Sequence, residues 1–341
     1  MNISTGQISN MIAKGAFRPH TALTNMALAY YQNARNYFAK AIFPICPVNL
    51  SSDNFYIFNK EDLLRDNWRR KPAYGQVQPA VVSEHTDTYA CQVDQMIMGI
   101  DQIRQTDLQR RQGPALRDPR KQRTKTIAEQ ANIHQDLLFA EHFFKTGVWV
   151  NEWSGVDDTN VAGKQFIKFS NHNSDPLKFI DERKSAMHGE TGRTPNKLAI
   201  GENVFNALKH HPGILERVIH GGTSANPANV TQKALAELFE VEELVVLKSI
   251  YNKAKQGAEA DMSYIGDPNA LLLAYATDAP SPDEPSAGYI FTWDMLGDGQ
   301  ILPIIHRVKD DATHSEEVEG LMAYDMKKTA DDLAMFCKDV V

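Results

Sequence analysis

The stretch TPNKLAIGENVFNALKHHPGILERV, residues 194–218, predicts a strand, a glycine turn and a helix. Residues 198–200 are an apolar run suited to a buried strand. After Gly201 the apolar residues recur at helical spacing, and a proline–glycine pair at 212–213 interrupts the helix before the apolar stripe resumes. One face of this segment is therefore expected to pack on a core, and the turn raises the question of a bound ligand.

A phosphate-binding turn would have a similar order of elements, because the first amides of a helix bind anions. Neither G-x-G-x-x-G nor G-x-x-x-x-G-K-[ST] occurs here, and a lone glycine lets only one backbone amide approach a ligand closely. We expect a structural turn that binds no cofactor.

Length and charge limit the class of protein. A chain of 341 residues suggests about two domains. A formal net charge of −7 argues against a general nucleic-acid clamp, which needs lysine and arginine to neutralise phosphates. No apolar stretch approaches the roughly 18 residues of a membrane span, and the first residues do not resemble a secretory signal. A cytoplasmic protein without a membrane segment is expected.

No catalytic or metal-binding residue is predicted. Cys46, Cys91 and Cys337 are widely spaced and lack a C-x-x-C pair, so neither a disulfide framework nor a zinc site is indicated. His134, Glu141 and His142 do not form H-E-x-x-H, and the adjacent pair at 210–211 would diverge by about 100° on a helix. G-x-S-x-G is absent as well. A hydrolase or nucleotide-binding enzyme would need a site that these patterns do not reveal.

Two strand-like segments, NFYIF at 54–58 and HTDTYACQV at 85–93, are predicted to pair as the legs of a long hairpin. Between them RDNWRRKPAYGQVQPA, residues 65–80, has no apolar period, and so long a loop is uncommon unless it has a function. An interface arm fits best, because tryptophan, tyrosine and arginine anchor interfaces. A plain surface loop and an RNA-binding loop are the alternatives. The candidate interface residues are Trp68, Arg69, Arg70, Lys71 and Tyr74.

A basic segment, Arg104 to Lys125, leads into a long helix predicted over residues 121–146. At 1.5 Å per residue this helix would be near 35 Å long, enough to cross a domain as a structural spine. The basic segment also leaves open a nucleic-acid-binding module, which salt-dependent DNA binding would support.

The remaining segments predict helices and strands in mixed order. A helix is expected at Pro176–His188 and another at 231–241, with Thr231 as its N-cap. LVVLKSIY at 244–251, NALLLAYA and GYIFTW read as strands, so the order after residue 195 is strand, helix, helix, strand, strand, strand. The C-terminal segments are expected to return to a sheet beside the long helix.

Taken together, these segments resemble the major capsid proteins of tailed bacteriophages, which share the Hong Kong 97-type fold. The resemblance covers about residues 50–340. It rests on the order and spacing of FFKTGVW at the end of the long helix, SDPLKFIDERKSAMHGETGRTPNKLAIGENVFNALKHHPGILERV, and ALAELFEVEELVVLKSIYNKA followed by ALLLAYA.

The resemblance implies an α+β, Hong Kong 97-like capsid fold. Its expected parts are an N-terminal arm (1–53), an extended hairpin loop or E-loop (54–93), a peripheral domain (94–194) with the spine helix (121–146), an axial domain (195–305) and a return to the peripheral domain (306–341).

The implied function is structural rather than enzymatic. Copies would assemble into the hexamers and pentamers of an icosahedral shell that encloses viral double-stranded DNA without sequence-specific binding. Any scaffolding protein would be a separate chain, since the arm starts almost at Met1, and portal and decoration proteins are further possible partners. The expected location is the virion capsid, assembled in the host cytoplasm. The alternative is an encapsulin-like compartment, which cargo would distinguish.

Overall fold

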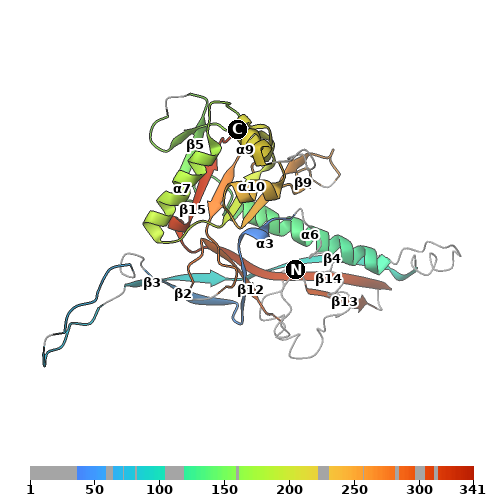
Figure 1. Cartoon of the computed structure of the whole chain (residues 1–341). Coiled ribbons are helices and arrows are strands. Elements are labelled where there is room, and N and C mark those ends of the chain that lie inside the picture. The colour runs from blue at the N-terminus through green and yellow to red at the C-terminus, as the bar shows by residue number, and fades with distance from the viewer. Residues whose placement is uncertain are drawn as a thin grey trace.

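The computed structural model covers all 341 residues. It describes residues 37–58, 64–71, 73–80, 83–103, 119–158, 161–221, 230–255, 257–280, 284–295, 304–310 and 314–341. Most of the predicted arm (1–53) and of the basic segment (104–125) lies outside these described residues. The described chain forms two larger sheets with a long helix across them, and a hairpin that reaches away from the body (Figure 1).

A six-stranded sheet consists of β5 (Glu152–Val156), β6 (Gln165–Ile167), β7 (Lys197–Gly201), β8 (Glu243–Leu247), β11 (Leu271–Ala274) and β15 (Ala334–Lys338). Its strand order is β6-β5-β15-β11-β7-β8, with β7 parallel to β8 and antiparallel to β11. The 3₁₀ turn η1 (Asp331–Leu333) leads into β15. Strands β7, β8 and β11 are mostly apolar because both faces of the sheet are covered.

Four helices cover one face of this sheet, namely α7 (Pro176–Thr191), α8 (Glu202–His210), α9 (Pro212–Gly221) and α10 (Gln232–Leu238). The predicted interruption at 212–213 is confirmed, because α8 ends at His210 and α9 starts at Pro212. The predicted N-cap is also confirmed, since Thr231 Oγ1 accepts a hydrogen bond from the Ala234 amide at 3.2 Å.

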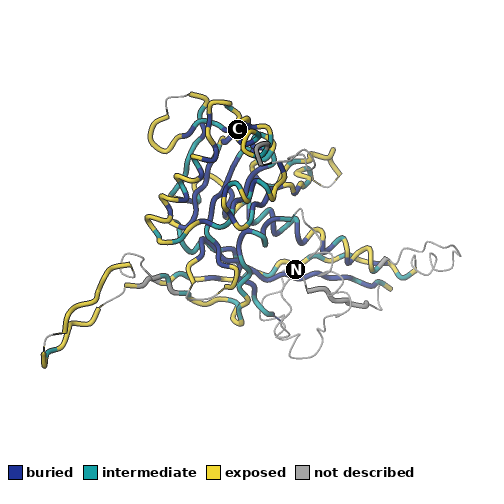
Figure 2. The backbone as a smooth tube through the Cα atoms, viewed as in Figure 1, coloured by how far each residue is buried: buried dark blue, intermediate teal, exposed yellow. Residues whose placement is uncertain are grey.

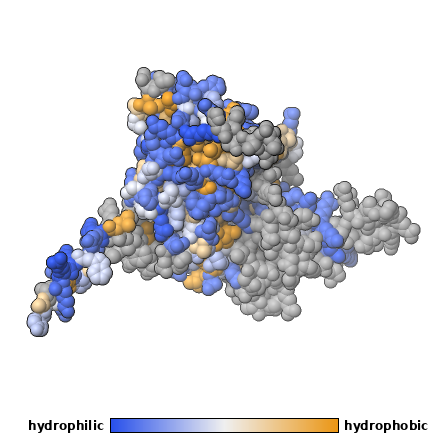
Figure 3. Space-filling view, viewed as in Figure 1, coloured by the Kyte–Doolittle hydropathy of each residue, from blue (hydrophilic) through white to orange (hydrophobic). Residues whose placement is uncertain are grey.

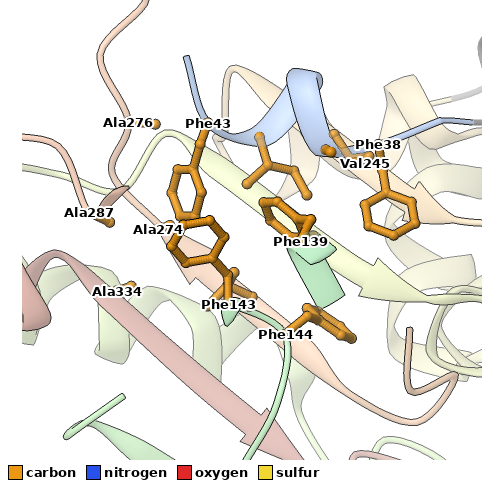
Figure 4. Packing of buried hydrophobic residues seen from close by; sticks show 14 of the residues in the cluster. Phe38, Phe43, Phe139, Phe143, Phe144, Val245, Ala274, Ala276, Ala287 and Ala334 are labelled. Atoms are coloured by element: carbon orange, nitrogen blue, oxygen red, sulfur yellow. The ribbon is translucent and has the colours of Figure 1, made fainter. Parts of the chain in front are cut away.

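The opposite face is covered by the end of α6 (Pro119–His142) and by the short helix α3 (Ala39–Ile42). Figure 4 shows the phenylalanine rings of these segments packed close to one another. The Phe43 and Phe143 rings meet edge to face at 4.7 Å between centroids. Leu272 points into this core while its neighbours Leu271 and Leu273 point into the other, as strand geometry requires.

A second sheet consists of β1 (Ile45–Val48), β4 (Gln92–Asp101), β12 (Gly288–Trp293), β13 (Ile304–Asp310) and β14 (Ser315–Lys328). Strand β14 is central: it pairs with β4 along one edge and with β13 and then β12 along the other. The first half of α6 lies on this sheet, where Ile127 and Ala128 contact Val318. The predicted return of the C-terminal segments beside the spine helix is therefore confirmed.

Some predicted element bounds are wrong. Helix α6 spans Pro119–His142 rather than 121–146; its final amide bonds reach Phe144, and the chain turns at Gly147, whose φ is +82°. Helix α7 runs to Thr191, three residues past the prediction, because Gly192 adopts the left-handed conformation that ends a helix.

The predicted order after residue 195 is also incomplete. Among the described residues, three helices, not two, follow β7 before β8, and the strand predicted over 244–251 is two strands, β8 and β9 (Ile250–Asn252). Strand β9 forms a two-stranded hairpin with β10 (Met262–Tyr264). The break falls at Ser249, whose hydroxyl donates to Asp136 instead of continuing the strand surface.

Candidate functional site

The candidate loop is carried by a hairpin of β2 (Ser52–Phe58) and β3 (Glu84–Ala90). These strands pair antiparallel over their whole length, which confirms the predicted hairpin. The second leg was predicted to continue to residue 93, which is wrong: the chain leaves the hairpin at Cys91, whose amide donates to Ser51 O at 2.8 Å, and β4 begins in the other sheet.

Aromatic side chains fix the base of the hairpin to the second sheet. The Tyr89 ring stacks on Phe291 of β12 with 4.8 Å between centroids, and Phe55 packs on the same ring at 5.5 Å. The Ala90 amide donates to Asp325 Oδ2 of β14 at 2.9 Å. The base of the hairpin is therefore anchored to the second sheet, and the described part of the loop lies away from the body (Figure 1).

All five candidate interface residues lie on the exposed part of this loop (Figure 2). The side chain of Trp68 is 94% exposed, and Tyr74 is fully exposed. Arg69, Arg70 and Lys71 are exposed beside them, and Figure 3 shows a largely hydrophilic arm. A tryptophan that contacts almost none of its own chain is unusual for a folded protein and is typical of a surface that another molecule covers.

The local backbone presents these side chains outward. The Trp68 amide donates to Asp66 Oδ1 at 2.9 Å, a local turn that precedes the cationic residues. Tyr74 has a φ of +61°, the left-handed conformation, in the turn before Gly75. Arg65 adds a fourth cation, so the described loop is basic within an acidic chain.

The polar pairs in the described chain do not form a catalytic site. His211 Nε2 lies 3.2 Å from Ser174 Oγ, the spacing of a base and a nucleophile. However, Ser174 Oγ donates to Asn171 O at 2.6 Å, and the Gly213 amide donates to His211 Nδ1 at 3.2 Å, so the ring has no carboxylate to orient it. Both side chains are buried, and burial lowers the pKa of His211. The pair is structural.

His134 contacts the second sheet rather than a metal ligand set. Its Nε2 lies 3.2 Å from Asp94 Oδ2 and 2.7 Å from the Tyr324 hydroxyl, and the hydrogen bond from His134 lowers the pKa of Asp94. Glu141 and His142 are exposed on the same helix. Within the described residues, no group of three histidine, cysteine or acidic side chains could hold a metal ion. Across that same part of the chain, no helix has the length and apolarity needed to span a bilayer.

One polar site was not predicted from the sequence. Asp136, on the buried side of α6, accepts hydrogen bonds from two chain segments that are distant in sequence. Its spacing from Phe139 could have indicated this, because a residue three positions before a core residue lies on the same face of the helix.

Comparison with known proteins identifies the fold. No protein-family model matches the chain. The major capsid protein of Burkholderia phage BcepMu is 30% identical over 145 residues, which are 41% of this chain and 43% of that relative's length. The match therefore spans less than half of the relative.

Three solved structures share the fold over most of their length. A phage-related protein from Bordetella bronchiseptica matches with a TM-score of 0.69 at 20% identity, over 94% of this chain and 97% of that one. A virus-like particle protein from Pyrococcus furiosus matches with a TM-score of 0.51 at 10% identity, over 94% of this chain and 99% of that one. The mature capsid of bacteriophage PhiM1 matches with a TM-score of 0.50 at 10% identity, over 89% of this chain and 87% of that one. The chain has the tailed-phage major capsid fold that its sequence predicts.

Proposed function

We propose that this protein is the structural subunit of a phage head, which self-assembles into an icosahedral shell around double-stranded DNA. The proposal is supported by the capsid fold and by the matched segment of the BcepMu major capsid protein. The observation that carries it is the exposed Trp68 loop on an anchored hairpin, because it has the composition of an interface and no partner surface within the described chain.

The proposed role is structural rather than enzymatic. The five loop residues would contact neighbouring copies, and many modest interfaces of this kind, summed over a closed shell, give a stable structure. Hexamers and pentamers are the proposed units. Scaffolding, portal and decoration proteins are proposed as partners of the shell, and the particles would form in the host cytoplasm before becoming virions.

The division of the chain into named parts belongs to the same proposal. The extended loop would be residues 54–93 following the arm at 1–53, with the peripheral domain at 94–194 and 306–341 and the axial domain at 195–305. The sheets join strands from across these ranges, since β5 and β15 belong to the same sheet as β7. The proposed boundaries therefore describe how the parts would pack in a shell, and they do not coincide with the boundaries of the sheets.

Negative-stain electron microscopy with light scattering on the purified full chain tests the proposal. Closed shells, or ring-shaped hexamers and pentamers, are the expected result. A mass that stays at that of a monomer or dimer at all concentrations, with or without the other head proteins of the same phage, would contradict it. The contents of the particles then distinguish the two shell functions. Double-stranded DNA indicates a phage head, and a packaged enzyme indicates an encapsulin-like compartment.

A further inference from the structure

One buried carboxylate, that of Asp136 on α6, holds two segments that are far apart in the chain. Its Oδ1 accepts hydrogen bonds from the Phe38 amide at 3.1 Å and the Ala39 amide at 3.0 Å. Its Oδ2 accepts a hydrogen bond from Ser249 Oγ at 2.5 Å. Asp136 is 1% exposed and Ser249 is 5% exposed, so water does not readily replace any of these donors.

On the N-terminal side, Asp136 caps α3 from another helix. The first amides of a helix have no partner within the helix, and Phe38, at the N-cap position, makes no side-chain cap bond. The Asp136 carboxylate supplies that acceptor. The Phe38 ring also packs edge to face on Phe139, at 5.6 Å between centroids, so polar and apolar contacts both hold α3 on α6.

On the other side, Ser249 is the base of the β9–β10 hairpin. Its carbonyl accepts the Ile265 amide at 2.9 Å, which closes the hairpin where it leaves the body. Strand pairing places Ile250 directly opposite Tyr264. With Met262 they form an apolar outer face, on which these side chains are 49%, 40% and 57% exposed respectively.

The inner side of the hairpin faces α6 across a hollow. The cavity measures about 480 Å³ and is lined by Tyr251 and Ile265 from the hairpin region and by Leu137, Leu138 and Glu141 from α6. Because a two-stranded hairpin is only marginally stable alone, its orientation depends on how its base is attached. The Ser249–Asp136 hydrogen bond is a fixed point of that attachment.

We propose that Asp136 couples the docking of α3 to the seating of the β9–β10 hairpin. If α3 detaches, Oδ1 loses two donors, and a buried carboxylate with unmade hydrogen bonds draws in water or rearranges. Either response disturbs the bond from Ser249. Coupling of this kind is reciprocal, so loosening the hairpin also weakens the docking of α3.

The consequence reaches beyond shell formation. A contact that displaces α3 would change the orientation of the exposed face formed by Ile250, Met262 and Tyr264. The start of α3 and the base of the β9–β10 hairpin are more than 200 residues apart in the sequence, yet both donate hydrogen bonds to the Asp136 carboxylate.

Amide hydrogen exchange on the full-length chain, kept as dispersed subunits, tests the coupling in both directions. Ser249→Ala removes the donor to Oδ2 without touching α3; we expect the amides of Ala41 and Phe43 to exchange about tenfold faster, the effect of losing one hydrogen bond. Ile42→Ala loosens α3 without changing a residue of the hairpin; we expect the amide of Lys253, which donates to Asp261 within the hairpin region, to exchange faster by a similar factor. Core amides in β11 should not change.

Two controls make the result specific. Ser263→Ala makes the same chemical change on the hairpin away from Asp136, and it should leave α3 exchange unchanged. In an Asp136→Leu background, or Asp136→Asn if the leucine variant does not fold, Ser249→Ala should have little further effect on α3. Changes confined to each mutated segment, or transmission that persists without the carboxylate, would overturn the proposal. Both readouts concern dispersed subunits, so they are independent of shell formation.

Discussion

The carbonyl oxygen of Pro268 lies 2.2 Å from the point where a Cβ atom on Gly201 would stand. The same oxygen accepts hydrogen bonds from the Asn203 and Val204 amides at 3.1 and 3.4 Å. The first amides of α8, which a phosphate would need, are thus already used by the protein's own backbone. The glycine at the β7–α8 turn is there so that another loop can approach closely, which gives the turn a structural function.

Replacing Gly201 by alanine should destabilise the fold. The added methyl group would overlap the Pro268 carbonyl, a backbone atom that cannot move aside as a flexible side chain would, so we expect a loss of about 2–3 kcal/mol in the free energy of unfolding. Urea denaturation followed by circular dichroism measures it. Gly189→Ala is the matched control: it lies within α7 with no atom within 4 Å of the added Cβ, so it should stabilise by about 0.5–1 kcal/mol. Equal effects from both changes would refute the close-approach explanation.

His211 should make stability depend on pH, with stability lost as the pH falls below the ordinary histidine pKa. Burial lowers its pKa in the folded chain, with smaller effects from His172, which lowers it, and Asp175, which raises it. Because the folded pKa lies below the unfolded value, the unfolded chain takes up the proton first. Stability is therefore complete above the unfolded pKa, near 6.5, and is lost as pH falls.

The variant His211→Gln should flatten this part of the stability curve, measured as unfolding free energy at a series of pH values. The adjacent His210 is exposed and serves as the control, since His210→Gln should leave the curve unchanged. An identical pH profile for the wild type and His211→Gln would rule out this residue as the source of the acid sensitivity.

The ion pair between Arg120 and Glu316 predicts unequal costs for removing its two members. Arg120 donates through Nε and Nη2 to the two Glu316 oxygens, at 2.8 and 2.7 Å, which joins the start of α6 to β14. The Glu316 side chain is 3% exposed, whereas that of Arg120 is 37% exposed. Arg120→Met leaves a buried carboxylate without its main cation and should cost about 3 kcal/mol. Glu316→Met leaves a cation that can reach water, so its loss in the free energy of unfolding should be smaller. Chemical denaturation measures both variants, and a larger loss for Glu316→Met would contradict this explanation.

Local sequence patterns were sufficient for elements whose contacts are close in the chain. The apolar run before Gly201, the proline at 212 and the cap at Thr231 each act on neighbouring residues, so β7, the α8–α9 break and the start of α10 could be predicted. Strand β4 could not, because its alternation is weak and its partner β14 lies more than 200 residues away.

The functional residues show the same difference between local and long-range features. The Trp68 loop was visible because its composition is unusual within a few residues. The function of Asp136 was not, since it depends on amides 97 and 98 residues earlier and on a hydroxyl 113 residues later. Similarly, the strand predicted over 244–251 ends early for a reason that lies on α6, outside any window of local sequence.

The loop itself supplies the last prediction. Trp68→Ala, or Arg69→Glu with Arg70→Glu, should leave the subunit folded, because these side chains contribute nothing to the buried cores. Assembly should weaken, since losing an aromatic anchor commonly costs 2 kcal/mol or more per interface, which is roughly a 30-fold loss at each contact. Circular dichroism and thermal unfolding verify the fold, and light scattering with electron microscopy measures the fraction assembled. Lys178→Glu, on an exposed position of α7, controls for charge reversal alone. Normal particles from both loop variants would remove the loop from the interface, and an unfolded variant would contradict the expectation that these exposed side chains lie outside the core.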